Sequence, residues 1–116
     1  MDIPYLRNEF INEKQFLHFL YSNTRKNADK ISKASDRQLN ILIKICHLIS
    51  SGGISIRDKD FNALKASRRL NLFTSLFDKR DNLLSILSAS KETKIKELKK
   101  FVTLFPHLLY TMFNKD

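Results

Sequence analysis

The stretch from Ser35 to Gly53 constrains the fold more than any other part of the chain. It reads SDRQLNILIKICHLISSGG, and its apolar residues recur at helical spacing on two stripes. A helix that is apolar around most of its circumference belongs in the middle of a bundle. Ser35 and Gln38 form a capping-box pattern at the start, and Gly52–Gly53 can supply the left-handed residue that ends a helix. We therefore predict a central helix over about residues 35–50.

The rest of the composition favours further helices around this one. The 116 residues include only two glycines and two prolines, which leaves little turn chemistry for a fold of many strands. Hydrophobic residues make up 42% of the chain, enough for a real core. We expect residues 1–116 to form a single all-α domain, a compact bundle of five to seven short helices.

At the N-terminal end, apolar spacing predicts a firm helix over residues 13–22 and a short basic helix within residues 23–33. Two interpretations stay open for the residues before them. One is a continuous helix from about Pro4 to Ser22. The other is a break near Asn12, with Asn12 as the helix cap and Gln15 as its reciprocal partner.

After the central helix, Ile54 and Ile56 predict a short extended link. Further helices are expected to begin near residues 58–60 and 67, and a short one lies around residues 83–87. Ser90 is a good cap for the last helix, whose pattern KETKIKELKKFVTLF places apolar residues on one face. Pro106 should end or kink that helix, because proline removes a hydrogen-bond donor.

No residue pattern predicts catalysis, a metal or a cofactor. The histidines His18, His47 and His107 have no partner at metal-ligand spacing except Cys46 beside His47. Adjacent helical residues point about 100° apart and do not normally bind one ion together. Cys46 lies on an apolar stripe, which indicates a buried, inert thiol rather than a nucleophile. We therefore expect that the protein is not an enzyme and has no catalytic, metal or cofactor site.

The location is expected to be intracellular. A single cysteine allows no disulfide framework, and the first residues, MDIPYLRNEF, lack the pattern of a secretion signal. No stretch approaches the roughly 20 apolar residues of a transmembrane helix. We expect a protein that is not secreted and has no transmembrane segment.

The charge pattern suggests a polyanionic partner. The chain carries 21 Lys and Arg against 12 Asp and Glu, a formal charge of +9. Such an excess attracts nucleic acid, although it also describes a solvated surface that keeps a small protein soluble. Phosphate contacts need clustered cations but no particular sequence. The predicted nucleic-acid-binding residues are Lys65, Arg68, Arg69, Lys94, Lys96, Lys99 and Lys100. A third basic group comprises Arg25, Lys26, Lys30 and Lys33.

The apolar stretch Phe101–Phe113 supports an alternative function. It can close the core, which is the more common arrangement, or it can dock on another subunit or a membrane. In the docking case the protein is an interaction or assembly module that binds a second copy of itself or a capsid partner.

The spacing of several residues in region 34–87 is similar to a pattern found in a known protein family. The matching features are Ala34, the pair Gln38–Leu39, the helix ending at Gly52, and then Ile54, Ile56, Leu64, Leu70, Arg80 and Leu83–Leu84. This set resembles a small basic helical protein of Maverick/Polinton-type elements and adintovirus-like DNA viruses of animals. Members of that family look like adenovirus core protein X precursors. The resemblance implies a virion-associated, DNA-contacting role in the host nucleus or the virion.

Overall fold

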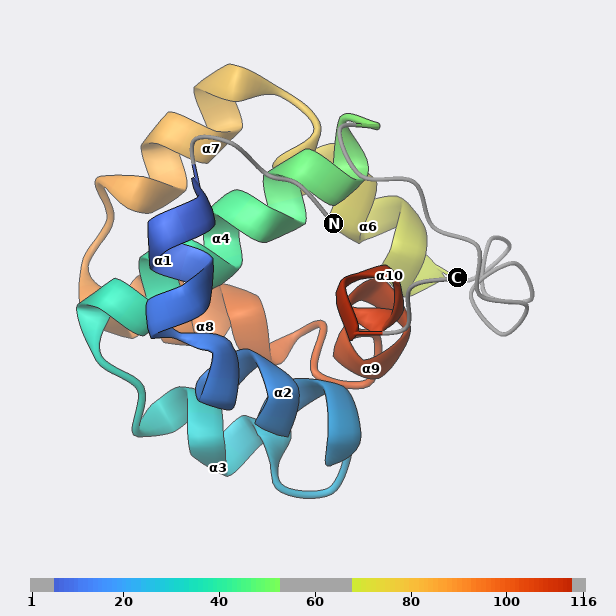
Figure 1. The fold of residues 1–116 in the computed structure, drawn as a ribbon. Helices are drawn as coiled ribbons and strands as arrows, with labels where there is room; N and C mark the ends of the chain where they lie inside the picture. The colour runs from blue at the N-terminus through green and yellow to red at the C-terminus, as the bar shows by residue number, and fades with distance from the viewer. Residues whose placement is uncertain (1–5, 53–67, 114–116) are drawn as a thin grey trace.

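Helix α4 (Asp36–Ser50) crosses the middle of the molecule (Figure 1). The computed structural model describes residues 6–52 and 68–113. Within these residues α4 packs against α6 (Arg68–Phe77), α7 (Arg80–Leu87) and α8 (Lys91–Lys99). Its buried residues are Leu39, Ile41, Leu42, Ile43, Ile45, Cys46 and Ile49. The predicted central helix is therefore confirmed.

Both ends of α4 are held as the sequence predicts. The Ser35 hydroxyl accepts a hydrogen bond from the Gln38 backbone N–H at 3.1 Å, and the Gln38 side chain accepts one from the Ser35 N–H at 3.0 Å. Gly52 has a φ of +84°, in the left-handed region that favours glycine. The capping box and the glycine stop are confirmed.

The other described elements are also helices, and no strand occurs in residues 6–52 or 68–113. The all-α prediction is confirmed. The remaining helices are α1 (Arg7–Asn12), α2 (Lys14–Ser22), α3 (Asn27–Ser32), α9 (Phe105–Leu108) and α10 (Tyr110–Phe113). Helix α2 packs against α9, and α3 packs against α8. The predicted link at residues 54–56, the helix expected near residues 58–60 and the cap at residue 67 lie outside the described residues.

The N-terminal helical region is broken, as one of the two interpretations predicts. Helix α1 ends at Asn12, and α2 begins at Lys14. The predicted cap is wrong, however. The residue at the cap position is Glu13, which makes no side-chain capping hydrogen bond. Its carboxylate instead lies 3.5 Å from Nε of Arg37 at the start of α4.

The last predicted helix ends earlier than expected. Helix α8 stops at Lys99 instead of continuing to Phe105. Proline clashes with the carbonyl four residues before it and offers that carbonyl no N–H, so the effect of Pro106 reaches back to Val102. Residues 100–104 form a turn instead, with bonds such as Phe101 N–H to Leu98 O at 3.0 Å. Pro106 then lies in the first turn of α9, where its ring is tolerated.

The C-terminal stretch closes the core. Three rings, Phe73, Phe77 and Phe101, lie with centroids 5.0–5.9 Å apart. The buried residues of the stretch are Phe101, Leu104, Phe105, Leu108, Leu109 and Met112. The alternative interpretation, in which these side chains form an exposed docking surface, is therefore wrong. They bury apolar area that stabilises the bundle at roughly 25 cal/mol per Å².

Candidate nucleic-acid interface

Most of the predicted phosphate-contacting residues lie at the surface. The exposed ones are Arg68, Arg69, Lys96, Lys99 and Lys100. Lys65 lies outside the described residues. Lys94 differs from the rest, because only 5% of it is exposed.

A phosphate-contacting residue is expected at the surface, and Lys94 is buried instead. Its Nζ donates a hydrogen bond to Oδ1 of Asn40 at 2.8 Å and lies 3.8 Å from Oδ1 of Asp36. Lys94 therefore ties α8 to α4 and has little surface to offer a phosphate. The physical reason is its position four residues before the buried Leu98, which places both on the same face of α8.

Arg69 connects the start of α6 to the turn of residues 100–104, which follows α8. Its Nη1 donates a hydrogen bond to Oγ1 of Thr103 at 2.9 Å. In Figure 1 this turn is the orange segment that leads from α8 to α9. The contact brings the predicted basic groups at Arg68–Arg69 and Lys99–Lys100 together, although more than 30 residues of sequence separate them.

A second contact brings the third basic group to the same turn. Nδ2 of Asn27, the first residue of α3, donates to the carbonyl of Val102 at 3.4 Å. Arg25 and Lys26 immediately precede Asn27 in the chain. We name the exposed cations around this turn the turn cluster; they are Arg25, Lys26, Arg68, Arg69, Lys99 and Lys100.

Within residues 6–52 and 68–113, one ion pair offsets the charge of the turn cluster. Lys100 pairs with Glu97 at 3.0 Å. Among the described residues, Arg25, Lys26, Arg68, Arg69 and Lys99 form no ion pair. Elsewhere, acidic residues do pair with cations: Lys44 with Glu9 at 3.3 Å, and Lys33 with Asp29 at 3.3 Å. Five of the six cations of the turn cluster therefore keep their charge free of a described carboxylate partner, as do other exposed cations such as Lys79 and Arg80.

Sequence reasoning did not place Asn27 in the interior, and it named Arg25 and Lys26 in a third basic group without including them among the predicted binding residues. Asn27 is completely buried. One pattern in the sequence agrees with this burial: Asn27 lies four residues before the buried Ile31, on the same face of α3. Its long-range partner, Val102, cannot be read from local spacing.

Cys46 is buried in α4, as its position on the apolar stripe predicts. Burial raises the pKa of this thiol far above its usual value, and a backbone hydrogen bond opposes the shift only in part. The thiol stays protonated and enclosed by the core. Within residues 6–52 and 68–113, no group of three or more His, Cys, Asp or Glu side chains could hold a metal ion.

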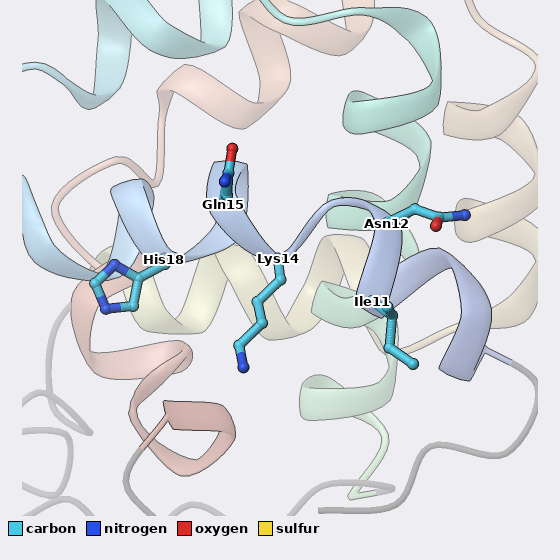
Figure 2. A pocket seen from close by; sticks show the side chains of 5 residues that line it. All are labelled: Ile11, Asn12, Lys14, Gln15 and His18. Atoms are coloured by element: carbon cyan, nitrogen blue, oxygen red, sulfur yellow. The ribbon is translucent and has the colours of Figure 1, made fainter.

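A separate hollow of about 680 Å³ lies along α1 and α2. Figure 2 shows its lining residues, with Ile11 and Lys14 pointing to the same side; the full lining is Ile11, Asn12, Lys14, Gln15 and His18. Ile11 is 61% exposed. The hollow is open and combines one apolar side chain with a cation.

No family model, curated protein or solved structure matches this chain. Among the described helices, none is long and apolar enough to cross a membrane.

Proposed function

We propose that this is a non-enzymatic, basic helical protein that binds nucleic acid without sequence preference. The observation that supports this proposal best is the turn cluster, in which contacts made by Arg69 and Asn27 tie basic segments from distant parts of the sequence to the turn of residues 100–104. A polyanion with closely spaced phosphates can contact these basic segments at once.

The physical basis is counterion release. Duplex DNA carries one negative charge per roughly 1.7 Å of its axis and holds condensed cations. Each lysine or arginine that contacts a phosphate releases some of these cations to solution. Binding through the turn cluster therefore needs no base contact and weakens steeply as salt is added.

The resemblance to proteins of Maverick/Polinton-type elements and adintovirus-like viruses adds a biological setting to the proposal. In that setting the protein is of viral or transposon origin and acts in the host nucleus or in a virion. Its nucleic-acid partner there is the DNA of the element. Packaging requires contact with DNA of any sequence, which agrees with phosphate contacts alone.

A salt titration with mixed-sequence duplex tests the proposal. The logarithm of the binding constant should fall linearly with the logarithm of salt concentration, with a slope of about −0.9 per phosphate contacted. The double variant Arg25→Ala/Lys26→Ala should weaken binding and reduce the slope. A matched control is Lys79→Ala/Arg80→Ala, which removes the same two charges from exposed positions at the start of α7.

The control pair should change binding less than the Arg25 and Lys26 pair. No binding of the unmodified protein at low salt would reject nucleic-acid binding altogether. Equal losses for both pairs would show that net charge, and not the turn cluster, attracts the duplex.

The exposure of Ile11 favours a second candidate, an interaction or assembly module. In this function a second copy or a capsid partner would place an apolar group in the hollow of Figure 2 and a carboxylate near Lys14. Sedimentation of the free protein and of Ile11→Gln tests self-association. A monomer at all concentrations would count against assembly through this hollow.

A further inference from the structure

Asn27 bonds to the end of α2 and to the turn at Val102, which lies 75 residues after it in sequence. Its buried Nδ2 donates to the carbonyl of Leu20 at 3.0 Å and to the carbonyl of Val102 at 3.4 Å. An amide NH₂ has two hydrogens, so one group can serve both acceptors.

Both of these carbonyls lack a helical donor. Leu20 lies in the last turn of α2, where carbonyls have no partner within the helix. Val102 lies four residues before Pro106, which has no N–H to offer. Asn27 therefore supplies the donor that a helix end and a proline each leave missing.

The amide oxygen of Asn27 is not used in the same way. Oδ1 is buried and makes no hydrogen bond to any described residue. A buried acceptor without a partner costs free energy, and this cost offsets what the two Nδ2 bonds contribute. The side chain is therefore expected to influence geometry more than net stability.

We infer that Asn27 is a positioning residue for nucleic-acid binding. It fixes the segment of Arg25 and Lys26 against the turn that begins at Lys100 and follows Lys99, so that one duplex contacts both. The inference rests on the proposed function.

Fixed spacing matters because phosphates repeat regularly along a duplex. When two basic segments are held together, the first contact brings the second to its phosphate at high effective concentration. When the two segments move independently, each segment loses conformational freedom separately on binding. The second phosphate contact then adds less to the affinity.

The test combines Asn27→Leu, which removes the amide while keeping a similar volume, with Arg25→Ala/Lys26→Ala. Duplex affinity and its salt slope are measured for the unmodified protein, each variant and the combination. At about 100 mM salt, Asn27→Leu alone should weaken binding roughly fivefold to tenfold and make the slope shallower by about one to two. Added to Arg25→Ala/Lys26→Ala, it should change affinity less than about twofold, because the segment it positions no longer carries charge.

The inference is wrong if Asn27→Leu binds like the unmodified protein, or if it causes the same loss in both backgrounds, as general damage to the fold would. If circular dichroism shows that Asn27→Leu does not fold, the same measurements are made with Asn27→Ser, whose hydroxyl can replace one of the two bonds. The proposed function is judged separately by the unmodified protein: its failure to bind duplex rejects both, whereas binding without the Asn27 effect rejects only the positioning role.

Discussion

His47 and Phe77 join the C-terminal ends of α4 and α6. Nδ1 of the His47 ring donates a hydrogen bond to the backbone carbonyl of Phe77, the last residue of α6. A carbonyl can only accept, so this bond assigns the ring proton to Nδ1. It also satisfies one of the carbonyls that the end of a helix leaves without a partner.

We expect His47→Ala to lower the free energy of unfolding by about 1–2 kcal/mol, because it leaves the Phe77 carbonyl without this donor. Urea denaturation measures the change. His47→Asn keeps a donor close to the position of Nδ1 and should recover part of the loss. Equal losses for the two variants would mean that ring packing, and not the hydrogen bond, matters.

Replacing Lys94 and replacing Lys96 should have different effects on stability, although the two residues are only two positions apart. Lys94→Ala should destabilise the protein by about 1–3 kcal/mol, because it leaves Oδ1 of Asn40 without its donor and removes a buried side chain. Lys96→Ala should stay within about 0.5 kcal/mol of the unmodified protein, since Lys96 is exposed.

Urea denaturation of both variants, together with their duplex affinities, checks this pair. The expected result is that Lys94→Ala loses stability and Lys96→Ala does not. A stable Lys94→Ala protein that binds duplex more weakly would return Lys94 to the phosphate-contacting residues.

Gly52 is expected to resist replacement for reasons of backbone conformation alone. A Cβ built at this position meets no atom within 4 Å, but φ is +84°. Gly52→Ala should therefore cost about 1–2 kcal/mol of stability, the usual penalty for the left-handed region. Gly52→Asn should cost less, because asparagine tolerates that region better. A thermal melt of both variants measures the order, and an alanine variant as stable as the glycine protein would contradict the explanation.

Cys46 should not react with a thiol reagent in the folded protein. The raised pKa keeps the thiol protonated as pH increases through about 8.5, where an ordinary cysteine forms its reactive thiolate. The reaction rate of the native protein should therefore stay low across that range and rise only when the chain is unfolded. Fast labelling of native protein that accelerates with pH would show an accessible thiolate.

Local patterns predicted the parts of the fold that depend on neighbours in sequence. The cap at Ser35, the stop at Gly52 and the apolar faces of α4 follow from residues within a few turns of each other. Lys94 was misplaced because its charge suggested solvent, while its position on the face of Leu98 indicated the interior. A lysine can be buried when an amide oxygen accepts a hydrogen bond from its ammonium group. For Lys94 that acceptor is Asn40, which lies on another helix.

The candidate site was predicted only in its parts. Charge counting identified the separate basic groups, but their link to one turn depends on Arg69 reaching Thr103 and on Asn27 reaching Val102. Such contacts join distant residues, and periodicity carries no information about them. The sequence identified Pro106 as a helix breaker. It did not show that the Val102 carbonyl, which Pro106 leaves without an N–H donor, would accept a hydrogen bond from Asn27.

The packing of α2 against α9 has a consequence for when the bundle can fold during synthesis. The buried face of α2 carries Phe16, Leu17 and Leu20, and its partner is made some 85 residues later. A nascent chain that has reached α8 still lacks the residues that cover α2. The apolar face of α2 can be covered by α9 only after translation has passed α9, so the bundle closes late in synthesis.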